Sequence, residues 1–126
     1  MKERDGRHRG LQTFRDAWRG IVSVAKSEFN FRVHLACLVP VIVFGCFFEV
    51  SAVEWIALTL CVGFVLFAEI LNSALEYLAD TVHPEVDPGI GKAKDASAGA
   101  VLVASLAAAT VAAIIFIPKI WSLLTK

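Results

Sequence analysis

Three carboxylate side chains recur within a stretch of otherwise apolar sequence, FAEILNSALEYLAD, together with an amide and a hydroxyl. At about 100° per residue of helix, these side chains share one polar face about three turns long. Charged residues inside a membrane span are expensive and are candidate functional residues by default. Carboxylates can accept a proton from a hydroxyl, or hold Mg²⁺, which prefers oxygen ligands. The face consists of Glu69, Asn72, Ser73, Glu76 and Asp80.

Other interpretations of this polar face stay open at this point. Asn72 and Ser73 alone could form a hydrogen-bonded seam with a neighbouring helix. Such a seam would not need the carboxylates of Glu69 and Glu76. The same carboxylates could carry ions or protons in a small transporter. A purely structural membrane protein would leave Glu69 unexplained.

The next stretch is DTVHPEVDPGIGKAKDASAGAV, and its two prolines and two glycines within residues 80–95 predict a loop there. We expect Asp95 near the N-terminus of the helix that follows, where the helix dipole favours a carboxylate and where Asp can act as a cap. Lys94 stands beside it, and a lysine together with free backbone N–H groups at a helix start suits a phosphate. A nucleotide with its magnesium ion is therefore chemically sensible here.

The composition indicates which elements must position these groups. Of the 126 residues, 57% are hydrophobic and only 19% are charged, whereas a soluble domain has roughly 25% charged residues. Three apolar runs predict membrane spans over about residues 31–50, 55–79 and 96–118. Before them, residues 11–28 alternate apolar and basic side chains at helical spacing, which indicates an amphipathic surface helix. We expect an all-α membrane protein with a single domain covering residues 1–126.

The charge distribution predicts the orientation of the chain in the membrane. Eight of the 12 basic residues precede the core of the first span, and the connection between the first two spans has none. The positive-inside rule therefore places the N-terminus and the second connection in the cytoplasm. The formal net charge of zero suggests no nucleic-acid partner.

The remaining polar and small residues give weaker signals. The three cysteines have neither zinc-site spacing nor the number for a disulfide framework. The histidines are scattered, and we expect packing or solvation for His34. Glu28 ends the surface helix and could be a plain interfacial carboxylate. Alanines recur at every fourth position of the third span, which favours close helix approach and self-association. They are Ala96, Ala100, Ala104, Ala108 and Ala112.

The motifs AEILNSALEYLAD and KAKDASAGAVL resemble the signature of the small bacterial integral-membrane diacylglycerol kinases, a family that includes undecaprenol kinases. The resemblance covers nearly the whole chain, and SEFNFRVHL and SAVEW resemble the undecaprenol kinase branch. It implies a homotrimer with sites between subunits, in the bacterial inner membrane. It also implies transfer of the γ-phosphate of MgATP, on the cytoplasmic side, to a membrane lipid alcohol. Undecaprenol is the expected lipid; diacylglycerol and, in a different class, proton-coupled transport are the alternatives.

The resemblance also implies roles for individual residues. Glu69 would be the general base on the lipid hydroxyl, and Trp18 would lie near the lipid. Glu28 and Glu76 would hold the Mg²⁺ that bridges the ATP phosphates, which gives Glu28 more than an interfacial role. The residues implied to contact ATP are Glu28, Asn72, Glu76, Lys94, Asp95, Arg9, Glu85 and Asp87.

Overall fold

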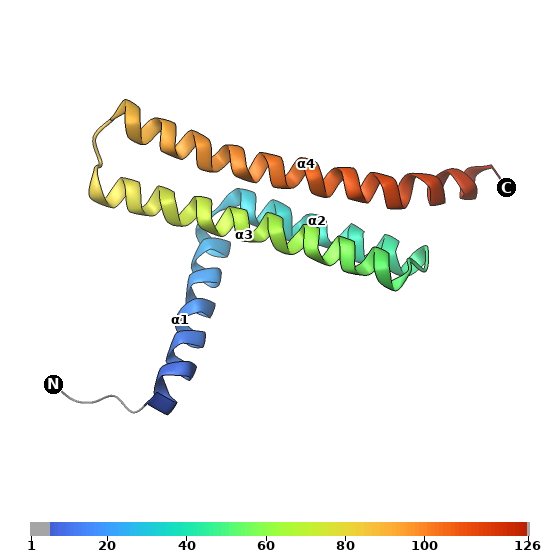
Figure 1. Cartoon of the computed structure of the whole chain (residues 1–126), viewed down its shortest axis with the longest axis horizontal. Helices are drawn as coiled ribbons and strands as arrows, with labels where there is room; N and C mark the ends of the chain where they lie inside the picture. Colours follow the sequence, from blue (N-terminus) through green and yellow to red (C-terminus); the bar gives the residue numbers. More distant parts are fainter. Residues whose placement is uncertain (1–5, 126) are drawn as a thin grey trace.

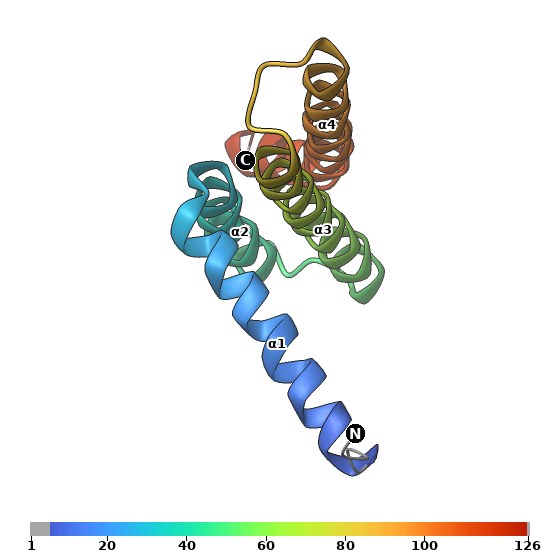
Figure 2. The ribbon, with the colours of Figure 1, turned by 90° about the vertical axis from the view of Figure 1, so that its left-hand side faces the viewer.

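Four helices make up the protein in the computed structural model, which describes residues 6–125 and the side chains from residue 10 onward. The helices are α1 (Gly6–Ser27), α2 (Phe29–Phe47), α3 (Ala52–Val82) and α4 (Pro88–Leu124). Helices α2, α3 and α4 lie side by side, and α1 projects away from them (Figure 1). The view in Figure 2 confirms that α1 meets the bundle only at the end where it joins α2. No strand occurs within residues 6–125.

The predicted architecture is confirmed. Helices α2, α3 and α4 are each long and apolar enough to cross a membrane. They contain most of the three runs predicted from the sequence, and α3 and α4 extend past these runs at both ends. Helix α1 covers nearly all of the predicted surface helix, and its apolar side chains, such as those of Leu11, Phe14 and Trp18, are exposed. An apolar face that no other helix covers suits a membrane interface.

The expectation of a long loop between the second and third spans was wrong. Helix α3 continues to Val82 and α4 already begins at Pro88. Asp87 caps α4, because its carboxylate accepts hydrogen bonds from the backbone N–H groups of Gly89 and Ile90. Proline in the first turn is compatible with this start, since a residue there needs no intrahelical N–H bond.

This early start also corrects the predicted positions of Lys94 and Asp95. Both lie more than one turn inside α4, so neither stands at its N-terminus. Asp95 does not cap the helix, and the free N–H groups of the helix start are not beside Lys94. A phosphate site built from Lys94 and a helix N-terminus is therefore excluded. Any phosphate contact of Lys94 must come from its ammonium group.

A hydrophobic cluster joins the three long helices at the end of the bundle where α2 turns into α3. Its buried members are Val50, Leu58, Ile115 and Phe116. The ring of Phe44 on α2 lies 6.0 Å from the ring of Phe116 on α4, centroid to centroid. These contacts fasten α4 to the α2–α3 hairpin at the end opposite to the α3–α4 connection (Figure 1).

The turn into α3 is held by a capping box. The Ser51 hydroxyl accepts from the Glu54 N–H at 3.3 Å, and a Glu54 carboxylate oxygen accepts from the Ser51 N–H at 2.7 Å. The same carboxylate lies 3.2 Å from the Lys119 ammonium on α4. Glu54 is thus explained by local structure, unlike the acidic residues farther along α3.

The predicted close approach through small residues is confirmed at one position. Helix α3 packs more extensively against α4 than any other pair of helices packs within the described residues. Ala104, near the middle of α4, is 2% exposed. Ala96 and Ala100 are exposed. The alanine spacing therefore serves packing within the chain only over its middle part.

Gly45 provides a test of the packing between α2 and α3. A Cβ at this position would lie 2.4 Å from the Trp55 ring, whereas a Cβ at Gly63 would meet nothing within 4 Å. We expect Gly45→Ala to lower the free energy of unfolding by about 1–3 kcal/mol through overpacking. Gly63→Ala, the matched control, should leave stability unchanged or raise it by up to about 1 kcal/mol. Titration with a denaturing detergent measures both, and equal stabilities would contradict this packing.

Candidate active site

The polar face predicted on α3 exists, and it turns toward protein. Glu69 and Ser73 are buried, Asn72 and Glu76 are partly buried, and Asp80 is exposed. Burial therefore decreases along the face toward the α3–α4 connection. The face divides between two neighbours, because Glu69 contacts α2, whereas Asn72 and Asp80 contact α4.

Glu69 is the most deeply buried charged group of the described chain. Its side chain is 4% exposed, and its Oε1 lies 3.1 Å from Nε2 of His34 on α2. An ionised carboxylate removed from water is strongly destabilised unless it is paired or hydrogen-bonded. The contact with His34 supplies that partner. The Ser73 hydroxyl donates to the backbone carbonyl of Glu69 at 3.0 Å. Ser73 therefore does not bond the Glu69 carboxylate.

Asn72 connects the polar face to α4. Its amide nitrogen donates to Glu76 Oε1 at 3.1 Å, and its amide oxygen accepts from the Ser97 hydroxyl at 2.6 Å. The Ser97 hydroxyl also lies 2.9 Å from the Lys94 carbonyl of its own helix. A hydrogen-bonded seam between helices thus exists here. It fixes the amide and one oxygen of Glu76 and does not involve Glu69.

Lys94 forms an ion pair with the last residue of the polar face. Its Nζ lies 2.8 Å from Asp80 Oδ1, and the two side chains are 34% and 67% exposed. Asp95 follows it directly and is exposed, and its carboxylate makes no hydrogen bond or ion pair within residues 10–125. The pair and the free carboxylate lie on the part of the bundle that is nearest to the α3–α4 connection.

Glu28 lies in the one-residue break between α1 and α2. Its backbone is extended, which ends α1, and its side chain does not cap α2. The Tyr77 hydroxyl of α3 donates to Glu28 Oε1 at 2.6 Å and also contacts the Ser27 hydroxyl. The Arg32 guanidinium holds the same break by donating to the Lys26 carbonyl at 2.8 Å. The junction thus fixes Glu28 against α3.

Two carboxylates lie on either side of the Tyr77 position. Glu28 accepts a hydrogen bond from the Tyr77 hydroxyl, and Glu76 directly precedes Tyr77 on α3. No group of three His, Cys, Asp or Glu side chains that could hold a metal occurs in the part of the chain described. Mg²⁺ does not need one, because it is usually bound through one or two carboxylates together with substrate phosphates and water. Glu28 and Glu76 fit that donor set.

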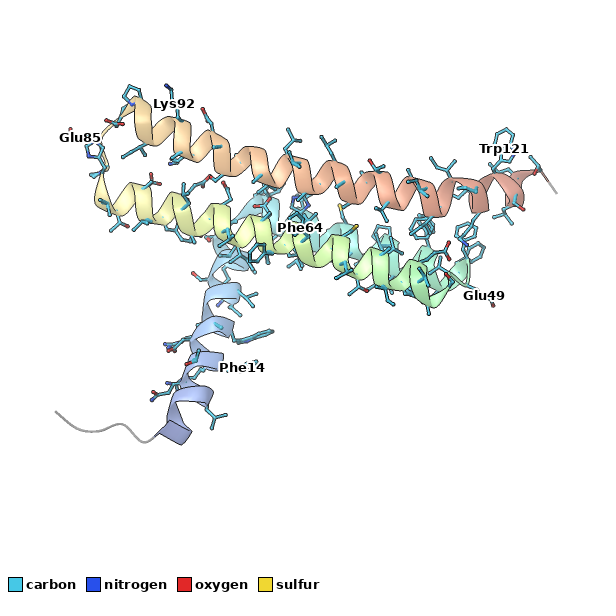
Figure 3. All side chains as sticks on the ribbon, in the orientation of Figure 1. Phe14, Glu49, Phe64, Glu85, Lys92 and Trp121 are labelled. Atoms are coloured by element: carbon cyan, nitrogen blue, oxygen red, sulfur yellow. The ribbon has the colours of Figure 1, made fainter. Side chains whose placement is uncertain are left out.

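Several residues implied by the resemblance lie apart from the polar face of α3 and from Glu28. Trp18 is 59% exposed on α1, and Figure 3 shows the side chain of Phe14, its neighbour on that helix, well away from the bundle. Glu85 lies exposed in the α3–α4 connection, and Asp87 is engaged as the cap of α4. Arg9 lies outside the residues whose side chains are described. One chain by itself does not assemble all of the implied contacts.

The sequence did not predict three residues that contact the polar face of α3 or Glu28. His34 was expected to be packed or solvated, yet it contacts Glu69; Tyr77 and Ser97 were not considered. For His34 a signal was present, since a polar side chain within an apolar span is itself unusual. Tyr77 and Ser97 carry no such signal. Their roles follow from which helix lies opposite, which spacing along one helix does not reveal.

Comparison with known proteins identifies the family of this chain. Residues 15–116 match the family model of the prokaryotic diacylglycerol kinases. The chain belongs to this family. The resemblance seen in the sequence is thereby confirmed, and the protein is a lipid kinase of the membrane. The transporter alternative is not supported.

Individual relatives from the family differ in their substrates. The chain is 35% identical to the undecaprenol kinase of Bacillus subtilis over 123 residues, which cover 95% of this chain and 100% of that protein. It is 35% identical to a diacylglycerol kinase of Synechocystis over 115 residues, 90% of this chain and 66% of that protein. It is 33% identical to the diacylglycerol kinase of Escherichia coli K12 over 92 residues, 73% of this chain and 75% of that protein.

Proposed function

We propose that this lipid kinase transfers the γ-phosphate of ATP to the hydroxyl of undecaprenol and forms undecaprenyl phosphate. The observation that carries the chemistry is the buried Glu69 carboxylate in an otherwise apolar helix bundle. The choice of lipid is supported by the match to the Bacillus undecaprenol kinase, which extends over nearly the whole of both chains. The two diacylglycerol kinases have similar identity but are covered less completely. Diacylglycerol is therefore the second candidate.

Glu69 would act as the general base. As the lipid oxygen bonds to the γ-phosphorus, its proton passes to the carboxylate, and the bond to the bridging oxygen breaks to release ADP. Phosphoryl transfer depends mainly on positioning and charge neutralisation, with a base that orients the attacking hydroxyl. Glu69 suits a hydroxyl that arrives from the bilayer, because its buried carboxylate belongs to a helix apolar enough to span a membrane.

The nucleotide would occupy the more exposed part of the polar face. Glu76 lies two turns from Glu69, about 10 Å along the helix axis at about 1.5 Å per residue. Glu28 and Glu76 would hold Mg²⁺, which neutralises phosphate charge when it is bound with ATP. Asn72 keeps Glu76 in place through their hydrogen bond. Lys94 and Asp95 would contact the nucleotide from α4, and Arg9, Glu85 and Asp87 remain proposals.

A homotrimer would complete the site. The polar face of α3 and Trp18 lie on elements that diverge within one chain, since α1 projects from the bundle (Figure 1). A lipid substrate near Trp18 could reach Glu69 only if another subunit brings the two together. The exposed apolar side chains of the long helices could be covered partly by neighbouring copies and partly by lipid.

The proposed orientation places the site at the cytoplasmic face of the bacterial inner membrane. Helix α1 and the α3–α4 connection lie toward one end of the bundle, and the α2–α3 turn lies at the other (Figure 3, Glu85 against Glu49). The basic residues of α1 from Arg15 to Lys26 belong to the first end, as the positive-inside rule expects of a cytoplasmic face. ATP would then be available where Glu28, Glu76 and Lys94 lie.

Initial rates with purified protein test the lipid. We expect radiolabelled ATP to label undecaprenol with a kcat/KM about tenfold or more above that for diacylglycerol at equal mole fraction in detergent micelles. A tenfold preference corresponds to about 1.4 kcal/mol in the barrier. A higher kcat/KM for diacylglycerol would overturn the choice of lipid, and no label in either lipid would overturn the kinase proposal itself.

The base is tested by Glu69→Gln. We expect turnover to fall by about 10²–10⁴-fold, because the amide cannot take the proton. ATP binding and the oligomer should be retained, since Gln keeps the shape of the side chain. Glu54→Gln is the control on the same helix, and its activity should equal that of the wild type. Near-normal turnover by Glu69→Gln would remove this residue from the base role.

The metal ligands are tested by Glu76→Gln. We expect the Mg²⁺ concentration for half-maximal rate to rise about tenfold or more, because a neutral amide holds a hard cation less well than a carboxylate. Glu49→Gln, an exposed carboxylate at the opposite end of the bundle, should leave the Mg²⁺ titration unchanged. An unchanged titration for Glu76→Gln would argue against ligation.

A further inference from the structure

His34 belongs to α2, a helix that carries none of the residues proposed for the base, the nucleotide or Mg²⁺. Its imidazole is 24% exposed, and Nε2 lies 3.1 Å from Glu69 Oε1. The Glu69 carboxylate contacts no other side chain by hydrogen bond or ion pair within residues 10–125. His34 is therefore the group that determines where this carboxylate can lie.

A buried carboxylate needs such a partner for two reasons. Without it, the charge is unsatisfied in surroundings of low polarity. A Glu side chain also has three rotatable bonds, so a free carboxylate would sample several positions relative to a lipid hydroxyl. A contact at Oε1 restricts these positions and leaves Oε2 open. Misplacement of a reacting group by about 1 Å can lower a rate by about 10²-fold.

We propose that His34 is a positioning residue for the base: its Nε2–H holds Glu69 Oε1, so that Oε2 faces the lipid hydroxyl. The proposal rests on the base role proposed for Glu69. His34 does not itself receive the substrate proton, which passes to Glu69. Removal of the imidazole should then lower kcat and leave the binding of ATP unchanged.

A cavity beside His34 makes the proposal unusually testable. It has a volume of about 310 Å³ and lies between α2, α3 and α4, with Cys37, Val65 and Ala108 among its walls. An apolar cavity of roughly half this size, about 150 Å³, admits benzene in another protein. Free imidazole can therefore enter the space that an alanine at position 34 would enlarge.

Substitutions that differ only in the donor give the first test. His34→Gln keeps an N–H donor, and His34→Leu has similar bulk but no donor. We expect kcat to fall about 10–100-fold in His34→Leu and clearly less in His34→Gln. The KM for ATP should stay within about twofold in both, since His34 touches no group proposed for the nucleotide. Equal kcat values for the two variants would overturn the proposal.

Chemical rescue gives the second test and separates positioning from folding. We expect added imidazole to raise the kcat of His34→Ala in a saturable manner. It should not change the wild type or His83→Ala, a control at the exposed end of α3. Detergent titration and size exclusion establish which variants are folded, and a folded His34→Ala that imidazole leaves unchanged would overturn the proposal. If His34→Ala does not fold, the Gln and Leu pair decides the matter.

Glu69→Gln measured in parallel distinguishes this proposal from the one on which it depends. If Glu69→Gln is active, the base role fails, and the positioning role fails with it. If Glu69→Gln is inactive while His34→Leu turns over at the wild-type rate, only the positioning role fails. The proposal holds when both variants lose kcat and imidazole restores only the alanine variant of His34.

Discussion

A carboxylate that lies inside an apolar helix bundle cannot be left alone, and much of this structure follows from that constraint. Glu69 is almost fully buried, and within residues 10–125 its carboxylate has one polar side-chain partner, His34. A buried carboxylate that lacks a polar partner is destabilised, because it has lost its hydration and gained nothing in return. Helix α2 must therefore be held with His34 toward α3. The hydrophobic cluster at the far end of the bundle supplies that register, because it joins all three long helices.

Helix α3 is the central element because its polar face has two neighbours. Glu69 turns to α2, whereas Asn72 and Asp80 turn to α4 through Ser97 and Lys94. Asn72 lies about 60° from Glu69 around the helix, so the two can face different partners, and Asp80 lies about three turns farther along α3. The face therefore contains a hydrogen-bonded seam together with the residues proposed for the chemistry. The seam fixes Asn72 and one oxygen of Glu76 and does not include Glu69.

The sequence was sufficient for everything that depends on spacing along one helix. The three spans, the surface helix and the polar face of α3 all follow from periodicity and length. The contacts between helices could not be obtained in this way, since the spacing on α3 does not say that His34 lies opposite Glu69. The predicted start of α4 was wrong for a different reason. Asp87 before Pro88 is the usual order of a capping residue and a first-turn proline, but the glycines nearby were interpreted as loop.

The two ion pairs of the proposed site, Lys94 with Asp80 and His34 with Glu69, differ in their exposure to solvent. The more exposed pair can exchange its partner easily, whereas the more buried pair cannot. Asp80 is exposed and Lys94 is partly exposed, and ion pairs in contact with solvent contribute little to stability because water and salt screen them. Lys94 can therefore leave Asp80 for a phosphate at small cost. Glu69 is buried, so separating it from His34 would leave its carboxylate without a polar partner. The proposed function needs both properties: a base that stays in one place between turnovers, and cationic contacts that release the nucleotide after each one. The burial gradient along α3, from Glu69 to Asp80, provides them on a single helix face.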